Sequence, residues 1–226
     1  QEEAISVFCA IPGIFLMLLD KVDPVLLNPV RYWMSAAANL PLEIETRWQE
    51  QIGVPIHQGY GLTETSPFAS YNHLEHYKPG SIGTPIDQVQ VKVVDVESGR
   101  DLDDFTPGEI LIRGPNVMRG YWNRPAETAE ALRGGWFHSG DIGYQDDQGY
   151  FFLVDRLKDM INVGGLKVYP AEVENVLYRH PGVAECAVFG APDPLLGERV
   201  KAHIVPQPDN TATPEEIIAF CRSQIA

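Results

Sequence analysis

The sequence predicts an α/β protein, and three patterns along its 226 residues lead to that prediction. Up to about residue 60, short apolar runs typical of buried strands alternate with segments of helical periodicity. Between residues 89 and 113, short strand-like runs are separated by Gly and Pro turns, which indicates a distorted sheet or a small barrel. From Met160 onward, the pattern is that of a compact unit of strands and helices.

The first section is expected to alternate strands with helices. Its opening apolar run, residues 4–19, is too short to span a membrane, and Pro12 and Gly13 interrupt it with a turn. Pro41 suits the first turn of a second helix. In chain order, the sequence predicts a strand before residue 12, a helix from near Gly13, a strand at 32–34, a helix from Pro41 to Ile52 and the edge of a buried strand at 54–56.

The later sections carry the same kinds of signal. Pro170 is expected to open a helix that His-Pro-Gly ends at residues 180–182, and Thr213 is a favourable N-cap for a last helix. The other predicted elements are strands at 89–94 and 109–113, a helix at 126–132, a strand-like segment ending at 139–141, a strand at 150–154, a hairpin at 161–168, and strands at 183–189 and 200–205.

Residues 58–65, Gln-Gly-Tyr-Gly-Leu-Thr-Glu-Thr, are the stretch with the most chemical content. Gly59 and Gly61 allow close backbone approach and backbone angles that other residues avoid. The ring of Tyr60 offers a flat apolar face on which a heterocycle can stack. A loop of this kind after a strand lies where α/β sheets bind ligands.

Two polar residues of this stretch suit a nucleotide. Thr63 can donate a hydrogen bond to a phosphate oxygen, and Glu64 is a hard oxygen ligand suited to Mg²⁺. Taken alone, the stretch is equally compatible with an ordinary turn whose glycines relieve steric strain and whose Glu64 is solvated.

Further blocks follow this stretch in a characteristic order. Together with residues 58–65, they resemble the adenylate-forming superfamily: acyl-CoA synthetases, adenylation domains of peptide synthetases, and luciferases. The resemblance runs from about Phe8 to the last residue and is specific to the superfamily, not to a substrate. The blocks are Trp-Phe-His-Ser-Gly-Asp at 136–141, Asp-Arg-Leu-Lys-Asp at 155–159, Gly-Gly at 164–165 and Pro-Ala-Glu-Val-Glu at 170–174.

The resemblance implies a particular domain organisation. Residues 1–157 are expected to be the C-terminal part of a large domain, α/β to about residue 88 and a distorted β-barrel subdomain after it. Residues 158–226 are expected to be the hinge and an incomplete small α+β domain. Several hundred residues would normally precede Phe8, so the chain is interpreted as a fragment.

The resemblance also implies an adenine site. Tyr60 would stack on the adenine, with Gly59 and Gly61 beside it. Ala36 and Ala37 match a turn whose backbone lies against the adenine in the family, but alanines stand here where glycines are usual. A tight strand–helix turn that contacts no ligand is the alternative.

Asp141 and Arg156 are implied as the ribose contacts. An aspartate beside a glycine can accept hydrogen bonds from two vicinal hydroxyls, and an arginine offers a planar fork of donors. Asp141 could instead stabilise its own loop as an Asx-turn, and Arg156 could pair with Asp155 or Asp159 at the surface.

Three residues near the domain boundary complete the implied site. Lys158 would be the hinge about which the small domain rotates after adenylation. Gly164 and Gly165 would line the pantetheine channel in the rotated state. The sequence alone favours the alternative that they form an ordinary hairpin turn.

The implied activity is that of an acid–thiol ligase that needs ATP and Mg²⁺. A carboxylic acid would give acyl-AMP, and the thiol of CoA or of a carrier-protein phosphopantetheine would displace AMP. A loading domain of a peptide or polyketide synthetase, a luciferase-type second reaction and a non-catalytic nucleotide-binding or interaction module are the alternatives. The sequence contains neither the family's Gly/Ser/Thr-rich phosphate loop before Phe8 nor its C-terminal lysine, so this chain by itself is expected not to adenylate efficiently.

Composition narrows the partners. A formal net charge of −14 argues against nucleic acid and anionic membranes, and no segment is suited to an integral membrane helix. The cysteines at positions 9, 186 and 221 lack metal-ligand spacing and an even count, which is typical of reduced, mostly buried residues in a cytoplasmic protein.

Two histidine-containing patterns carry little weight. His73 and His76 lie in a loop-like segment without a carboxylate cluster, which disfavours a metal site. His138, Ser139 and Asp141 supply the residue types of a hydrolase triad. Neighbours in sequence rarely meet in that geometry, and no Gly-x-Ser-x-Gly elbow is present.

Overall fold

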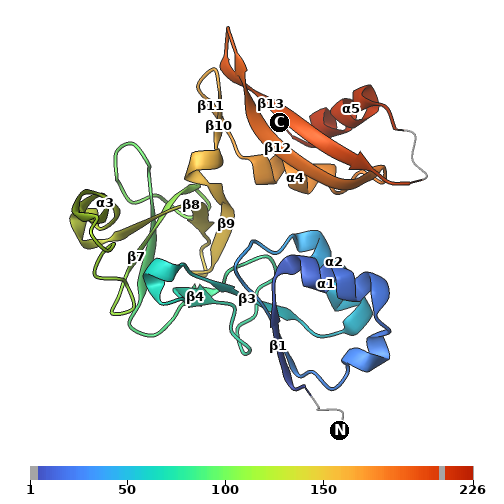
Figure 1. Cartoon of the computed structure of the whole chain (residues 1–226), viewed down its shortest axis with the longest axis horizontal. Coiled ribbons are helices and arrows are strands. Elements are labelled where there is room, and N and C mark those ends of the chain that lie inside the picture. Colours follow the sequence, from blue (N-terminus) through green and yellow to red (C-terminus); the bar gives the residue numbers. More distant parts are fainter. Residues whose placement is uncertain (1–4, 209–211, 226) are drawn as a thin grey trace. The chain divides into compact units, whose positions relative to one another are not determined.

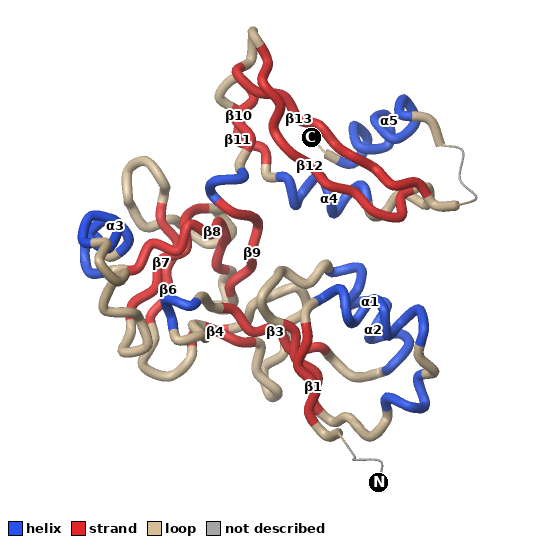
Figure 2. The backbone as a smooth tube through the Cα atoms, in the orientation of Figure 1, coloured by secondary structure: helices blue, strands red, loops and turns tan. Residues whose placement is uncertain are grey.

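The computed structural model of the protein describes residues 5–208 and 212–225, which form two compact units (Figures 1 and 2). One unit holds the described residues up to Ser139 together with Gly143–Leu153. The other holds Gly140–Ile142 and the described residues from Val154 onward. The domain boundary that the resemblance places after residue 157 stays a prediction. Within the described ranges, every helix is too short or too polar to cross a bilayer.

The first unit begins with a five-stranded sheet in the order β1-β2-β3-β4-β5. β1, β2 and β3 are parallel, while β4 and β5 run antiparallel to their neighbours. Phe15 and Trp48 of the two connecting helices pack with Trp33 of the sheet, and the two indole rings are 4.7 Å apart at their centroids. The bounds are β1 (Val7–Ala10), α1 (Pro12–Lys21), β2 (Tyr32–Ser35), α2 (Leu42–Ile52), β3 (Ile56–Tyr60), β4 (Ser70–Tyr71) and β5 (Thr84–Pro85), with 3₁₀ turns at Pro24–Leu27 and Thr63–Thr65.

The strands and helices predicted for this section are confirmed, except that the strand predicted at 54–56 begins at Ile56. β3 continues through Gly59 to Tyr60, so the predicted loop begins within a strand. The backbone of these two residues pairs with Tyr71 and Ser70 of β4. A partner strand only two residues long carries no periodic signal, which is why the glycines alone indicated a loop.

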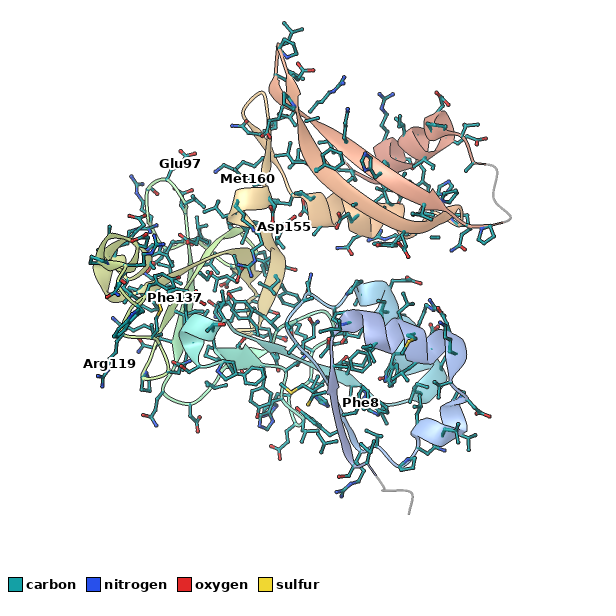
Figure 3. All side chains as sticks on the ribbon, viewed as in Figure 1. Phe8, Glu97, Arg119, Phe137, Asp155 and Met160 are labelled. Carbon is teal, nitrogen blue, oxygen red and sulfur yellow. The ribbon has the colours of Figure 1, made fainter. Side chains whose placement is uncertain are left out.

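A four-stranded sheet in the order β6-β7-β8-β9 stands where the sequence predicted a distorted sheet or barrel. Ile110, Ile112, Phe137 and Phe151 fill its core, and Figure 3 labels Phe137 on β8. The strand-like segment predicted to end at residues 139–141 instead continues through them to Gln145. The bounds are β6 (Gln90–Val94), β7 (Gly108–Arg113), α3 (Pro125–Ala131), β8 (Phe137–Gln145) and β9 (Phe151–Arg156), with a 3₁₀ turn at Arg133–Gly135.

The second unit contains a four-stranded antiparallel sheet in the order β11-β10-β13-β12. Leu177 of α4 and Ile217 of α5 join its core, and both helices lie along the β12–β13 ribbon in Figure 1. Thr213 caps α5 as predicted, since its hydroxyl accepts the Glu216 amide hydrogen and the Glu216 carboxylate accepts that of Thr213. The bounds are β10 (Ile161–Val163), β11 (Leu166–Val168), α4 (Pro170–Leu177), β12 (Val183–Asp193), β13 (Gly197–Pro206) and α5 (Pro214–Gln224), with a 3₁₀ turn at Leu157–Asp159.

The three cysteines are free. Cys186 and Cys221 are half-buried, and burial followed by the nearby Glu174 carboxylate raises the pKa of the Cys186 thiol to about 11. The expectation of mostly buried cysteines is wrong for Cys9, which is exposed. It lies on β1, the edge strand of the first sheet, where one side lacks a neighbouring strand among the described residues.

Candidate functional site

The two glycines of residues 58–65 have different reasons to be glycine. A Cβ on Gly61 would lie 1.8 Å from the carbonyl oxygen of Pro67, so the close approach of a second backbone excludes any side chain. A Cβ on Gly59 would instead meet side-chain atoms of Met34 and Phe68 at 2.6 and 2.5 Å. Gly61 therefore fixes the path of the chain where β3 ends.

The turn after Gly61 presents Thr63 and Glu64 from a rigid base. Thr65 is fully buried, and its hydroxyl oxygen accepts a hydrogen bond from the amide of Leu62 at 2.9 Å. Thr63 is exposed and Glu64 is half-buried. Both side chains thus belong to a short 3₁₀ turn that the buried Thr65 side chain stabilises by this hydrogen bond. Such a turn suits residues that must contact a ligand in a fixed position.

Tyr60 is more deeply placed than the sequence suggested. Only 6% of the residue is exposed, and it packs in the core cluster with Ile82 and Phe137. Only that small exposed part is available to a heterocycle in this conformation. The stacking role of Tyr60 stays a prediction.

The turn that contains Ala36 and Ala37 lies at the same sheet edge as residues 58–65. Ser35 and Gln58 are register partners on the parallel strands β2 and β3, and the turn follows Ser35 directly. The Gln58 side-chain oxygen accepts the amide hydrogen of Leu40 at 3.1 Å, which ties the turn to β3. The carboxyl ends of these strands are where α/β sheets bind ligands.

Two polar atoms at this edge were not foreseen from the sequence. Within the described ranges, the buried Ser35 Oγ and Gln58 Nε2 have no hydrogen-bond partner. Buried polar atoms without a hydrogen-bond partner are uncommon in folded proteins. Here two of them lie on neighbouring strands, close to the ends of those strands. Gln58 was visible in the sequence as the residue before Gly59 and Ser35 as the residue before the turn of Ala36 and Ala37, but nothing in the pattern marked their polar atoms as unpaired.

The segment that precedes α3 contacts the Glu64 turn, which sequence reasoning also missed. The Tyr121 hydroxyl donates a hydrogen bond to Glu64 Oε1 at 2.8 Å. Burial, then the hydrogen bond to Glu64 and the charge of that carboxylate, raises the pKa of Tyr121. The two residues are 57 positions apart, so no local pattern could connect them.

In the second unit, Asp141 and Arg156 are brought together. Arg156 Nε lies 2.7 Å from Asp141 Oδ1; the Asp141 side chain is 6% exposed and that of Arg156 is 51% exposed. The alternative pairing of Arg156 with Asp155 is not what the structure has. Asp155 accepts hydrogen bonds from the amides of Arg156 and Ala171 instead.

Lys158 is exposed on a 3₁₀ turn between β9 and β10, on the segment where Figure 3 labels Asp155 and Met160. It lines a pocket of about 440 Å³ within the second unit. The other charged residues of this pocket are all acidic: Asp155, Asp159, Glu174 and Glu198.

Gly164 and Gly165 form the turn between β10 and β11, which confirms the predicted hairpin. Both are exposed and have positive φ angles, 60° and 94°, a conformation that favours glycine. The Gly164 amide donates to the carbonyl of Leu196 at 2.8 Å. The turn therefore has a structural reason to be Gly-Gly, and its contact with pantetheine stays a prediction.

The two histidine-containing patterns have other partners. His138 Nδ1 lies 2.9 Å from Glu109 Oε2, while the Ser139 hydroxyl donates to the carbonyl of Ile110 at 2.6 Å. The rings of His73 and His76 are 6.3 Å apart at their centroids. Within residues 5–208 and 212–225, no group of three or more His, Cys, Asp or Glu side chains is arranged to hold a metal ion.

Comparison with known proteins places this arrangement in a family. Residues 1–122 match the model of the AMP-binding enzyme family, and residues 172–226 match the model of the AMP-binding enzyme C-terminal domain. The chain is 40% identical to a long-chain-fatty-acid–CoA ligase of Bacillus subtilis, covering 98% of this chain and 40% of the relative. It is 45% identical to a feruloyl-CoA synthase of an Amycolatopsis species, covering 88% of this chain and 41% of the relative.

Solved structures agree with the sequence comparisons. The structure of ATP-bound MatB from Rhodopseudomonas palustris superimposes with a TM-score of 0.93 at 31% identity, covering 98% of this chain and 44% of that one. The chain spans about two fifths of the length of the curated relatives it matches. Its sequence blocks, its fold and these matches agree, and the chain belongs to the AMP-binding enzyme family.

Proposed function

We propose that this chain is part of an ATP- and Mg²⁺-dependent acid–thiol ligase that converts a carboxylic acid to acyl-AMP and passes the acyl group to CoA. The observation that carries the proposal is that two turns follow neighbouring parallel strands at the same end of the sheet: the turn of Ala36 and Ala37 after β2, and the 3₁₀ turn of Thr63 and Glu64 after β3. The printed names of the relatives, which are CoA ligases and synthases, support CoA as the acceptor.

In the first unit, the proposal assigns the adenine and phosphate contacts. Ala36, Ala37 and the exposed part of Tyr60 would face the adenine. Thr63 would donate its hydroxyl to a phosphate oxygen, and the Glu64 carboxylate would be a ligand of Mg²⁺. Because Mg²⁺ at such sites is bound by one or two carboxylates together with phosphate oxygens and waters, a single half-buried glutamate fits it. When bound there, Mg²⁺ would neutralise negative charge on the phosphates.

In the second unit, the proposal assigns ribose and thiol contacts. Asp141 would accept hydrogen bonds from the ribose hydroxyls, and its ion pair with Arg156 would hold the carboxylate in one orientation. Lys158 would be the hinge of the family's domain rotation. Gly164 and Gly165 would line the path of the pantetheine arm, which their exposure and lack of side chains support.

The names of the relatives and the state of the cysteines support a substrate class and a compartment. The relatives are named for aliphatic and aromatic acids, so we assign an aliphatic or aryl carboxylic acid in place of an amino acid. Three free cysteines support a cytoplasmic location, where thiols stay reduced.

The test is acid-dependent exchange of labelled pyrophosphate into ATP by the complete ligase that contains this chain, with a panel of aliphatic and aryl acids. The unchanged protein should exchange label only when acid and Mg²⁺ are present. Glu64→Gln should lower the rate of exchange about 100-fold, because it removes the negative charge of the proposed Mg²⁺ ligand, and the metal is what stabilises the charge of the phosphates. Glu43→Gln, at an exposed position of α2, should leave the rate unchanged. Absence of exchange with every acid would refute the proposed function.

A further inference from the structure

Within the described part of the chain, the Glu64 carboxylate is held through one of its two oxygens. Oε1 accepts the hydrogen bond of the Tyr121 hydroxyl at 2.8 Å. Among the residues that the structure describes, none hydrogen-bonds to Oε2. One oxygen is therefore fixed by the protein, while the other keeps its lone pairs for a ligand.

Tyr121 is itself fixed by the segment around it. Its amide donates to the Thr128 hydroxyl oxygen of α3 at 2.9 Å, and that hydroxyl donates to the carbonyl of Arg124 at 2.7 Å. The preceding Gly120 has a φ of 148°, and a Cβ there would lie 2.6 Å from Thr128 Cγ2. The glycine thus permits the close approach that brings the Tyr121 backbone against α3.

The same segment also holds the backbone of the Glu64 turn. The amide of Met118 donates to the carbonyl of Glu64 at 2.8 Å. The Asn116 side-chain amide donates to the carbonyls of Thr65 at 3.0 Å and Phe68 at 2.7 Å. Residues 116–121 therefore fix both the main chain and the side chain of Glu64, which is more than a passing surface contact.

We propose that Tyr121 is a positioning residue for the metal site: its hydroxyl orients the Glu64 carboxylate so that the second oxygen is presented to Mg²⁺. The inference rests on the proposed function, because it takes Glu64 as the Mg²⁺ ligand. Partners that orient a metal ligand raise its affinity by removing wrong orientations before the metal binds, and their loss costs about 10-fold or more in metal affinity.

The test compares Tyr121→Phe with Tyr150→Phe in the complete ligase. Tyr150 is a matched control in the same unit, because its hydroxyl also makes one hydrogen bond, to the carbonyl of His76 at 2.9 Å. Two quantities are measured: the concentration of free Mg²⁺ that gives half-maximal pyrophosphate exchange, and the dissociation constant of Mn²⁺ by electron paramagnetic resonance in the presence of a non-hydrolysable ATP analogue. Tyr121→Phe should raise both about 10-fold, with a much smaller change in the rate at saturating Mg²⁺. Tyr150→Phe should change neither.

A second comparison separates positioning from a general structural role. In a Glu64→Gln background, adding Tyr121→Phe should change the Mn²⁺ dissociation constant by less than about twofold, because the charged ligand it orients is already gone. Unchanged metal constants in Tyr121→Phe, or a fall in rate alone, would overturn the inference while leaving the proposed function intact. If the unchanged protein shows no acid-dependent exchange, the proposed function fails and the inference falls with it.

Discussion

Ala37 occupies a backbone conformation that suits glycine better than alanine. Its φ angle is 71°, in the left-handed region where a Cβ crowds the following carbonyl, and the residue is exposed. We expect Ala37→Gly to raise the free energy of unfolding by about 1 kcal/mol, the strain removed less the added chain entropy. Ala38→Gly is the matched control. Ala38 is the next residue in the chain and is also exposed, but its φ angle is not positive, so its replacement by glycine should lower the free energy of unfolding. Urea unfolding of this chain measures both, and a loss in Ala37→Gly equal to that in Ala38→Gly would contradict the strain argument.

At the scale of single residues, the sequence predicted the local backbone structure better than it predicted the burial and contacts of side chains. The Gly-Gly pair at 164–165 was predicted as a hairpin turn, and the hairpin is confirmed. The burial of Tyr60 and the pairing of Arg156 with Asp141 could not be predicted, because both depend on residues far away in the chain. Local patterns report backbone geometry, whereas burial and ion pairs are set by tertiary packing.

At the scale of elements, α2 is joined to the loop before β5 through a buried carboxyl group. Glu45 is 3% exposed; its two oxygens accept hydrogen bonds from the Tyr77 hydroxyl and from the amide of Gly80, the latter at 2.8 Å. Burial raises the pKa of Glu45 above its ordinary value of 4.5, although both hydrogen bonds act in the opposite direction. The folded protein therefore holds this proton more tightly than the unfolded chain does.

This linkage predicts a pH dependence of stability. The stabilisation from the protonated Glu45 is fully present below about pH 4.5 and is lost as the pH rises through the raised pKa of the folded state. We expect the unfolding free energy of the wild type, minus that of Glu45→Gln, to fall across this window, because the amide cannot ionise. Urea unfolding between pH 4 and 8 measures the difference. Gln49→Ala, exposed on the same helix, changes no titratable group, and its difference from the wild type should stay constant. A constant difference for Glu45→Gln as well would show that its pKa is not raised.

The periodicity of the sequence was sufficient to predict most helices and strands. It was insufficient where pairing with a neighbouring strand sets the bounds of an element. The helices that Pro12, Pro41 and Pro170 introduce follow from local sequence, since proline suits a helix start and amphipathic spacing continues it. The extension of β8 from residues 139–141 to Gln145 depends on its neighbours in the sheet, β7 and β9. Gly140, with a φ of 68°, looked like a strand end in the sequence but is an irregularity within the strand.

At the scale of the whole molecule, the two units have separate hydrophobic cores. The core of the second unit is built from Ile161, Leu177, Val183, Val188 and Ile217, all of which belong to that unit. All four tryptophans, at positions 33, 48, 122 and 136, belong to the first unit, and Trp33 and Trp48 are buried there. Tryptophan fluorescence therefore reports unfolding of the first unit alone, while circular dichroism reports both.

This distribution of tryptophans allows the cooperativity of the chain to be measured. Leu177 is 2% exposed, so Leu177→Ala should destabilise the second unit by about 2–5 kcal/mol through lost burial and the cavity left behind. We expect the part of the circular dichroism change that comes from the second unit to occur at a lower urea concentration. The fluorescence transition should stay unchanged, because units with their own cores can unfold independently. Ile56→Ala, which removes a fully buried side chain from the first unit, is the converse control and should move the fluorescence transition. Equal shifts of both signals in Leu177→Ala would mean that the two units unfold as one cooperative body. A rotation about the proposed hinge at Lys158 would then have to overcome the coupling between the units.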